Sequence, residues 1–250
     1  MTRKTLLSHK PVIIAGPCSV SSRDQILRIA REMKRIGVHA LRAQLWKPRT
    51  KPDSFQGVGE KGIPWIKEIK STIGIPAAME VTSPQQVDLV AEIADILWVG
   101  ARNMQNYELL KRISKENHPV VLKRGLIATV DEWIAAGKYI GIDRVVFCER
   151  GIRTGADAMR FTLDLNAALS LKLDHHLPVV IDPSHTAGRR DAVPSLAKAA
   201  IACGADGLII ETHYNPEEEL VDKDQTMTIE AFEDVVSRIK EIYTITHRLS

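Results

Sequence analysis

Two sets of side chains in this sequence could do chemistry. The first set combines a thiol, an imidazole and two carboxylates, all of which can bind a divalent cation: Cys18, His185, Glu211 and Asp222. Mixed sulfur, nitrogen and oxygen ligands suit Mn, Fe, Co, Zn or Cu better than Mg or Ca. Their spacing matches no compact zinc motif, so the residues alone also allow each of them a separate structural role.

The second set is cationic. It consists of Arg42, Lys47, Arg49, Arg102, Lys123, Arg124, Arg150 and Arg153. Arginine binds phosphate and carboxylate through paired hydrogen bonds, whereas lysine supplies a point charge. If these cations converge, anions must neutralise them, and the set then predicts substrates with several anionic groups, such as two phosphates and a carboxylate. The alternative is that they are solvated surface groups.

Short apolar runs lead into most of these residues. The runs are residues 11–16, 39–43, 76–81, 96–101, 119–124, 144–149, 178–183 and 207–212. Each is apolar on both faces, as a parallel strand covered on both sides must be. Amphipathic stretches lie between the runs and predict helices over residues 22–36, 63–73, 83–93, 105–115, 129–139, 156–171, 191–203 and 228–244.

This alternation predicts both the fold and the position of the site. Eight strand–helix units in 250 residues match one (β/α)8 TIM barrel of class α/β, with an open doubly wound sheet as the alternative. No linker or change in composition divides residues 1–250, so we expect a single domain. Active sites of such barrels lie at the C-terminal ends of the strands, where nearly all of these residues fall. We therefore expect both sets to meet in one barrel mouth.

Composition argues against several classes of protein. The formal net charge is only +3 and no run of Lys or Arg is present, so we expect no nucleic-acid binding. No apolar stretch approaches the roughly 20 residues that span a bilayer, and the N-terminus lacks the pattern of a signal peptide. Three widely spaced cysteines form no disulfide framework, and we expect a cytoplasmic protein that binds no membrane.

Six segments, in order, resemble 3-deoxy-D-arabino-heptulosonate 7-phosphate (DAHP) synthase, in particular its compact microbial type I-beta subgroup. They are IIAGPCSV (13–20), KPRTKPDSFQGVGEKG (47–62), VGARNMQNYELL (99–110), VLKRGLIATVDEWIAAGKYI (121–140), CERGIRT (148–154) and DPSHTAGRRD (182–191). The GPC tripeptide alone is a weak signal. All six segments together extend across nearly the whole chain and form a specific one.

The resemblance implies a metal-dependent, aldol-like condensation of phosphoenolpyruvate with erythrose 4-phosphate that releases phosphate. It implies a divalent metal (Mn²⁺, Fe²⁺, Co²⁺ or Zn²⁺) bound by Cys18, His185, Glu211 and Asp222. The residues it implies for phosphoenolpyruvate are Arg102, Lys123 and Arg150, with Arg42, Lys47 and Glu80 lining the same pocket. Those it implies for the aldose phosphate are Arg49, Thr50, Ser184 and Arg153.

The resemblance also implies a homo-oligomer, a dimer or a tetramer. The catalytic residues are expected to be Lys47, Cys18 and His185. Lys47 is the candidate for proton transfer, because a lysine among other cations can have a lowered pKa. Since the chain starts near its first strand and ends after its last helix, we expect a barrel without a fused regulatory domain and without a response to Phe, Tyr or Trp.

Two departures from the family pattern are visible. The segment Ala43-Gln44-Leu45-Trp46 replaces the small glycines followed by Ala-Phe of many relatives, and we expect it to alter the site wall or a subunit contact. Gly155 replaces a usual aromatic residue, which predicts a more mobile loop.

Two other functions are considered. The sister enzyme, 3-deoxy-D-manno-octulosonate 8-phosphate synthase, uses arabinose 5-phosphate and typically carries Lys-Ala-Asn-Arg where this chain has Lys47-Pro48-Arg49-Thr50. The loop therefore favours the four-carbon sugar. A non-catalytic barrel that binds phosphorylated metabolites is the other alternative, but it would not need the four metal-type residues.

Overall fold

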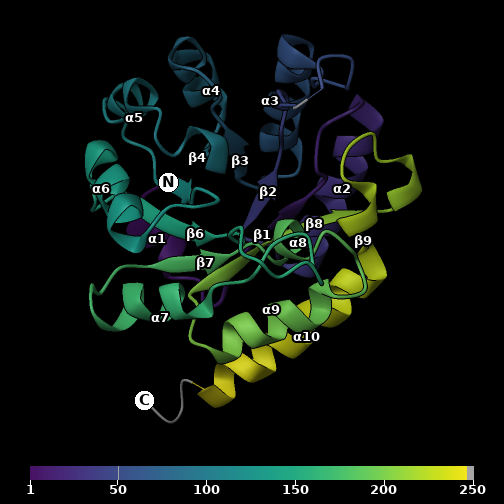
Figure 1. The fold of residues 1–250 in the computed structure, drawn as a ribbon. Helices are drawn as coiled ribbons and strands as arrows, with labels where there is room; N and C mark the ends of the chain where they lie inside the picture. Colours follow the sequence, from purple (N-terminus) through teal and green to yellow (C-terminus); the bar gives the residue numbers. More distant parts are fainter. Residues whose placement is uncertain (50, 247–250) are drawn as a thin grey trace.

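The structure, a computed structural model, describes residues 1–49 and 51–246. Within this part of the chain, parallel strands in chain order close into a barrel, which confirms the (β/α)8 fold and excludes the open sheet (Figure 1). Closure comes from the pairing of the first strand with the eighth, with Ile14 opposite Ile209. The strands are β1 (Val12–Gly16), β2 (Ala40–Arg42), β3 (Ala77–Glu80), β4 (Ile96–Val99), β5 (Val120–Lys123), β6 (Val145–Glu149), β7 (Val179–Ile181) and β8 (Gly207–His213), and a short β9 (Met227–Thr228) extends β8.

Helices surround the barrel, and α9 and α10 run side by side on its outside (Figure 1). The α-helices are α1 (Arg3–Leu7), α2 (Arg23–Ile36), α3 (Ile63–Thr72), α4 (Val87–Ile93), α5 (Tyr107–Ile113), α6 (Val130–Ile140), α7 (Leu165–Leu173), α8 (Pro183–Ala187), α9 (Val193–Ala202) and α10 (Ile229–Thr246). Short 3₁₀ helices are η1 (Gly59–Gly62), η2 (Pro84–Gln86), η3 (Ala101–Asn103), η4 (Pro216–Glu218) and η5 (Lys223–Gln225). The predicted capping box of α6 is confirmed, since Thr129 and Glu132 bond each other's backbone N–H groups.

The helix expected over residues 156–171 is wrong in its first half, because α7 begins only at Leu165. The preceding segment is held by backbone hydrogen bonds to α8, from Arg160 N to the Ala187 carbonyl and from Phe161 N to the Thr186 carbonyl. Asp164 then accepts the N–H of Ala167 and caps α7. These tertiary hydrogen bonds replace the local helical ones.

The interior of the barrel holds an apolar cluster separate from the larger one between strands and helices. It contains Leu6, Val12, Ile14, Ala40, Ala78, Ile96, Trp98, Val121, Val146, Cys148, Val180 and Ile209. Leu6 comes from α1, and the Arg3 guanidinium donates to the Ile142 and Val145 carbonyls beside the start of β6. We infer that α1 closes the N-terminal end of the barrel.

Strand alternation places a different kind of residue above this cluster. Side chains two residues apart in a strand point to the same side. On six of the eight strands the residue that follows the cluster by two positions is charged: Arg42, Glu80, Lys123, Arg150, Asp182 and Glu211. The C-terminal end of the barrel interior is therefore ionic.

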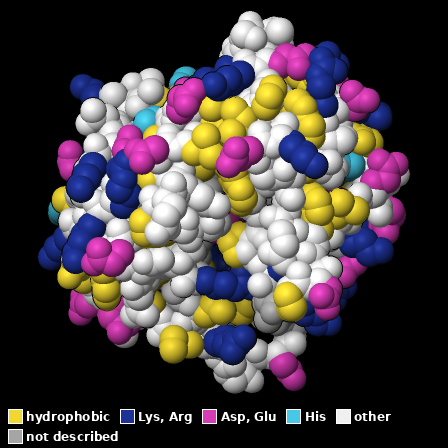
Figure 2. All heavy atoms as spheres, turned by 90° about the horizontal axis from the view of Figure 1, so that it is seen from above, with side chains coloured by type: hydrophobic (Ala, Val, Ile, Leu, Met, Phe, Trp, Pro, Cys, Tyr) yellow, Lys and Arg dark blue, Asp and Glu magenta, His cyan; other side chains and the backbone are white. Residues whose placement is uncertain are grey.

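The described part of the chain contains no helix suited to crossing a membrane; even α10, its longest helix, carries charged residues along its length. Figure 2 views the molecule from the upper edge of Figure 1. On that face Lys and Arg side chains are interspersed with Asp and Glu rather than gathered in one field.

Candidate active site

A cavity of about 440 Å³ opens at the C-terminal ends of the strands. Its polar lining comprises Lys47, Arg49, Lys51, Ser54, Glu80, Arg102, Asn103, Lys123, Arg150, Arg160, His185 and Asp222. These residues follow seven of the eight barrel strands, as expected for the active face of this fold. Cations thus outnumber carboxylates in the cavity, which suits anionic substrates.

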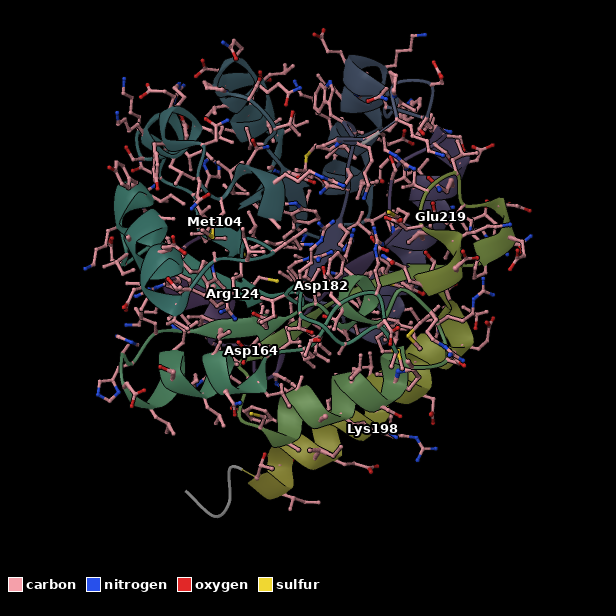
Figure 3. All side chains as sticks on the ribbon, viewed as in Figure 1. Met104, Arg124, Asp164, Asp182, Lys198 and Glu219 are labelled. Atoms are coloured by element: carbon pink, nitrogen blue, oxygen red, sulfur yellow. The ribbon has the colours of Figure 1, made fainter. Side chains whose placement is uncertain are left out.

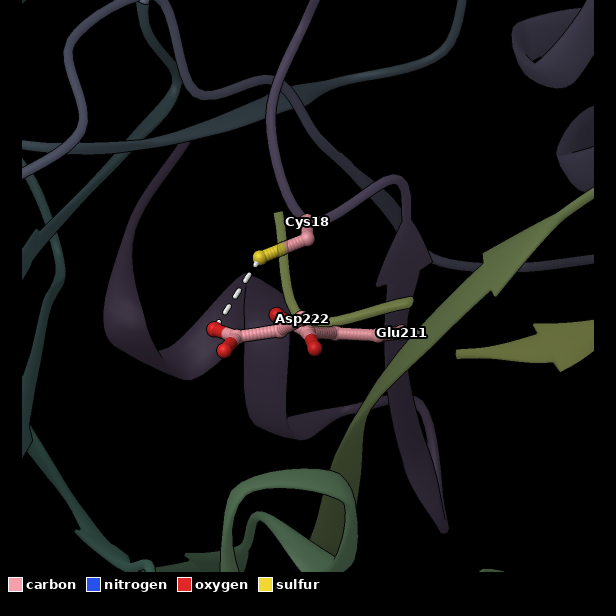
Figure 4. A group of neighbouring side chains, drawn as sticks. All are labelled: Cys18, Glu211 and Asp222. Atoms are coloured by element: carbon pink, nitrogen blue, oxygen red, sulfur yellow. Dashed lines mark hydrogen bonds between the residues drawn. The ribbon is translucent and has the colours of Figure 1, made fainter. Parts of the chain in front are cut away.

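The four predicted metal ligands lie together. Donor atoms of Cys18, Glu211 and Asp222 are all within 4.8 Å of one another (Figure 4). The Nε2 atom of His185 is 3.5 Å from Glu211 Oε1 and 4.0 Å from Asp222 Oδ2. They come from the loop after β1, from α8, from β8 and from the loop after β8, so only the fold joins them. Their role as ligands stays a prediction.

The chemistry of this donor set fits a divalent cation. Burial, together with the charges of Glu211 and Asp222, raises the pKa of the Cys18 thiol well above its usual value. Burying a thiol and two carboxylates side by side is unfavourable unless a positive charge neutralises them. A divalent ion would do so and would favour the thiolate, since a coordinating thiol is deprotonated. The residues therefore suit the metal that the sequence predicts.

Asp182 orients one of these donors. Its carboxylate can only accept, so His185 Nδ1–H donates to Asp182 Oδ2 at 2.8 Å and turns Nε2 toward Glu211. The same carboxylate accepts from Lys123 Nζ at 2.6 Å and from the His185 backbone N–H at 2.9 Å. Burial alone would raise the pKa of Asp182, but His185 and Lys123 hold it well below the usual range. Figure 3 shows Asp182 near the middle of the barrel.

Three arginines present unused donors. The Nη1 atoms of Arg42, Arg49 and Arg150 are buried and meet no acceptor among the described residues. Arg42 is fully buried and is not part of the cavity lining; its Nη2 donates to Glu211 Oε1 at 2.7 Å. Buried donors without acceptors are costly, so an oxyanion brought in by a substrate would complete these arginines.

The remaining predicted substrate residues divide into two groups. Arg102, Lys123 and Glu80 line the cavity with Arg49 and Arg150. By contrast, Arg153 is exposed and is not part of the cavity lining, and Ser184 is buried with its hydroxyl accepting the Glu211 N–H at 3.0 Å. Thr50 lies outside the described residues.

Arg124, which the sequence groups with the cationic set, turns away from the cavity. It pairs with Glu149 at 3.1 Å and with Asp164 at 2.8 Å (Figure 3).

One of the two departures from the family pattern, the segment Ala43-Gln44-Leu45-Trp46, also makes a clear contact. The side-chain oxygen Oε1 of Gln44 accepts the Glu80 backbone N–H at 2.7 Å, and the side-chain Nε2 donates to Glu80 Oε2 at 3.4 Å. Gln44 therefore holds Glu80 in the site wall. Gly155 is exposed.

The expected environment of Lys47 is wrong. Its Nζ donates to Cys18 Sγ at 2.9 Å and lies 3.9 Å from Asp222 Oδ2. Burial lowers the pKa of Lys47, but the Cys18 thiol and the Glu211 and Asp222 carboxylates outweigh burial and raise the pKa above its usual value. The effect of the metal-type residues on this lysine exceeds that of Arg42 from the cationic set, so the lysine stays protonated.

Three residues around the candidate ligands were not expected from the sequence. Gln225 donates to Glu211 Oε2 at 2.6 Å, and Arg160 contacts both Gln225 and Asp222. The Glu219 carboxylate accepts the Cys18 backbone N–H at 3.0 Å, and burial together with Glu211 raises the pKa of Glu219 to about 8. Arg160 and Glu219 lie in irregular loops and Gln225 ends the short η5 turn, so no periodicity indicates which way these side chains point.

Comparison with known proteins gives a consistent result. The family model of the DAHP synthetase I family matches residues 7–248. A protein of Thermotoga maritima named phospho-2-dehydro-3-deoxyheptonate aldolase is 43% identical over 233 residues, which cover 92% of this chain and 69% of the relative. A 2-dehydro-3-deoxyphosphooctonate aldolase of Desulfatibacillum aliphaticivorans is less similar, at 32% identity over 92% of this chain and 91% of the relative.

Solved structures agree with the sequence comparisons. The crystal structure of the DAHP synthase from Thermotoga maritima superposes with a TM-score of 0.89 at 42% identity, over 94% of this chain and 69% of that chain. A truncated form of 3-deoxy-D-arabino-heptulosonate 7-phosphate synthase from Thermotoga maritima gives 0.86 at 39% identity, over 94% of this chain and 87% of that chain. The family model matches nearly the whole chain, and the barrel topology agrees with the solved structures. This chain therefore belongs to the DAHP synthetase I family.

Proposed function

We propose that this protein is a DAHP synthase, a transferase of the shikimate pathway that condenses phosphoenolpyruvate with erythrose 4-phosphate. The observation that carries the proposal is the pairing of two features in one cavity. Buried arginine donors that meet no acceptor in residues 1–49 and 51–246 lie near four residues suited to a divalent metal. Anion binding alone would explain the arginines but not the Cys18, His185, Glu211 and Asp222 cluster, so the non-catalytic alternative is not favoured.

The reaction joins C3 of phosphoenolpyruvate to the aldehyde carbon of the sugar. Water adds to C2, and phosphate leaves with cleavage of its C–O bond. The aldehyde oxygen takes up a proton and becomes a hydroxyl. A divalent ion held by Cys18, His185, Glu211 and Asp222 would supply Lewis-acid polarisation of that oxygen.

The protein's own side chains bind the two substrates and supply the proton. Lys123, Arg150 and Arg102 bind the carboxylate and phosphate of phosphoenolpyruvate, where their charge also stabilises the departing phosphate. Arg49, with Thr50, binds the phosphate of the sugar. Lys47 carries its proton at Nζ beside Cys18 and donates it to the aldehyde oxygen as negative charge develops there.

Sugar choice follows the loop after β2. The segment Lys47-Pro48-Arg49-Thr50 supports the four-carbon sugar, and the higher identity to the heptulosonate enzyme than to the octulosonate enzyme points the same way. The alternative substrate is arabinose 5-phosphate. Mn²⁺, Fe²⁺, Co²⁺ and Zn²⁺ all fit a site with one sulfur, one nitrogen and two carboxylate donors.

We further propose a cytoplasmic homo-oligomer, a dimer or a tetramer. The three cysteines are free, and a reducing compartment would keep the Cys18 thiol available. The oligomer rests on the family resemblance alone. Sedimentation equilibrium at micromolar concentration would test it, and a monomer would contradict it.

The test is phosphate release from phosphoenolpyruvate with erythrose 4-phosphate and, in parallel, with arabinose 5-phosphate. Each mixture is run with the protein as purified, after EDTA, and after EDTA followed by Mn²⁺. We expect turnover with the four-carbon sugar that EDTA abolishes and Mn²⁺ restores. Turnover only with the five-carbon sugar would establish the sister activity instead, and none with either metal-loaded mixture would overturn the proposal.

A further inference from the structure

The two carboxylates of the candidate metal site use their oxygens unequally. Glu211 Oε2 accepts from Gln225 Nε2 at 2.6 Å, and Asp222 Oδ1 faces Arg160 Nη1 at 3.4 Å. The other oxygen of each carboxylate, Glu211 Oε1 or Asp222 Oδ2, faces His185 Nε2. Glu211 Oε1 also accepts from Arg42 Nη2 at 2.7 Å, so both oxygens of this carboxylate are held from outside the cluster, Oε1 by Arg42 and Oε2 by Gln225, while Oε1 also faces the other candidate ligands.

Gln225 connects these contacts. It is 1% exposed, and its backbone N–H donates to the Asp222 carbonyl at 3.2 Å across the η5 turn. Its side-chain carbonyl oxygen accepts from Arg160 Nη1 at 2.9 Å. The residue therefore belongs to the same turn as Asp222 while its amide contacts Glu211.

Arg160 fixes which way this amide faces. A guanidinium has only donors, so the amide oxygen of Gln225 must point to Arg160 and the amide nitrogen must point to Glu211. In turn, Arg160 is anchored because its backbone N–H donates to the Ala187 carbonyl at the end of α8, the helix that carries His185. Arg160, which orients the amide of Gln225, is thus bonded to the helix that carries the candidate ligand His185.

We propose that Gln225 is a positioning residue of the metal site, which sets the rotation of the Glu211 carboxylate so that Oε1 points to the ion. This inference rests on the metal dependence in the proposed function. Since Arg42 already donates to Oε1, a neutral donor suits this task because it holds Oε2 without adding a second positive charge beside the cation. Arg160 acts one step further out, by orienting the amide of Gln225. Outer partners of metal ligands typically change metal affinity about 10–100-fold when they are removed.

The test uses Gln225→Met, which keeps the length of the side chain but donates no hydrogen bond. The affinity for Co²⁺ is measured by competition with a chromophoric chelator, and the thiolate-to-cobalt absorption band reports on Cys18. We expect a dissociation constant about 10–100-fold larger than in the wild type, with a broadened or shifted ligand-field spectrum. Gln105→Met, on an exposed residue, is the matched control and is expected to bind Co²⁺ like the wild type.

Thermal unfolding of the metal-free proteins separates positioning from a general loss of structure. If Gln225→Met does not fold, Gln225→Asn replaces it; this variant keeps the amide but shortens its reach, and the same weakening is expected. A folded variant that binds Co²⁺ within twofold of the wild type, with an unchanged spectrum, overturns the positioning role alone. A wild type that binds no Co²⁺ and has no synthase activity overturns the proposed function and this inference together.

Discussion

The two halves of the barrel interior share the same strands but differ in chemistry. Toward the N-terminal ends the inward-facing side chains are apolar, for example Ala78, Val180 and Ile209. Two residues further along the same strands they are charged, namely Glu80, Asp182 and Glu211. We call the first group the lower layer and the second the upper layer.

The difference shows how the two-residue alternation of side chains along a strand lets the same strand contribute to both stability and function. The lower layer buries apolar surface and, apart from the Trp98 N–H, stabilises the barrel without a hydrogen-bond requirement. The upper layer buries charges, each of which must find a partner or cost free energy. Asp182 meets this requirement with Lys123 and His185, whereas the Nη1 of Arg42 stays without an acceptor among the described residues. The upper layer therefore keeps a buried donor for which the described residues offer no acceptor, and in the lower layer the Trp98 N–H is in the same position.

The largest expected effect is on catalysis, directly above the upper layer. Lys47→Met removes the ammonium that donates to Cys18. We expect kcat to fall about 10²–10⁴-fold, because a positioned proton donor is lost, while metal content measured by atomic absorption stays near that of the wild type. Lys61→Met, on an exposed lysine, is the control. A wild-type kcat in Lys47→Met would exclude proton transfer by this residue.

The lower layer predicts the opposite pattern. Ile209→Ala removes a fully buried side chain and should lower the free energy of unfolding by about 2–5 kcal/mol. The kcat of the folded fraction should stay within twofold of the wild type, because no upper-layer contact is touched. Urea unfolding beside steady-state assays would measure both, with Ile127→Ala at an exposed position as the control. A large loss of kcat without a loss of stability would mean that the layers are not separable.

Much of the fold could be predicted from the sequence because these two layers and the outer helices leave regular patterns. Seven of the eight predicted apolar runs contain the observed strand, the eighth ends one residue before β8 does, and the helix over residues 22–36 is found as Arg23–Ile36. Hydrophobic periodicity, Ser22 as the N-cap and Gly37 at the C-terminus act locally, so a short window of sequence contains them. The predicted helix does not form between residues 156 and 164, because the backbone there donates hydrogen bonds to α8. A local sequence pattern carries no information about such tertiary hydrogen bonds.

The candidate site was only partly predictable, for the same reason. The residues that point into the mouth follow from their position at strand ends, and the resemblance added roles for them. The hydrogen-bond partners of these residues cannot be inferred from position at a strand end. The proximity of Lys47 to Cys18 and the contacts of Gln225 depend on where loops and the short η5 turn place a side chain. Asp182 was the recoverable exception, since Asp followed by Pro at the start of a helix is an N-cap signature.

A smaller effect is expected at His39, at the N-terminal end of the barrel, where burial disfavours a positive charge on the imidazole. His39 accepts the Ile13 N–H at its Nδ1 atom, and burial, with His9 and Lys240, lowers the pKa of His39 to about 4. Below the unfolded pKa of about 6.5, the unfolded chain therefore binds this proton before the folded chain does. Stability should be complete above that pH and fall as the pH drops toward 4.

The test compares His39→Gln, whose side-chain oxygen can still accept the Ile13 N–H, with the wild type. We expect the wild type to lose about 2 kcal/mol more than the variant between pH 7 and pH 4.5, measured by urea unfolding. His175→Gln, on an exposed histidine, should retain the pH dependence of the wild type. Parallel pH profiles for wild type and His39→Gln would show that His39 does not titrate with folding.

The smallest effect is expected where the two layers meet, at Trp98. Its ring lies 5.1 Å from the Arg42 guanidinium and 5.3 Å from Lys123 Nζ, so it contacts the cations of the upper layer from the lower one. Its Nε1–H is buried and has no acceptor among the described residues. Trp98→Phe removes this unpaired donor, which is favourable, and leaves a small void, which is not. We expect the two to offset to within about 1 kcal/mol.

A second tryptophan makes this prediction decisive. Trp133 is equally buried, but its Nε1–H donates to the Leu122 carbonyl at 3.0 Å. Trp133→Phe creates a similar void and also leaves that carbonyl without this donor, so it should cost about 1–3 kcal/mol more than Trp98→Phe. Equal losses in urea unfolding would mean that the Trp98 N–H has an acceptor, such as a buried water. Hydrogen bonding would then extend from the upper layer into the lower one, and the boundary between them would lie below Trp98.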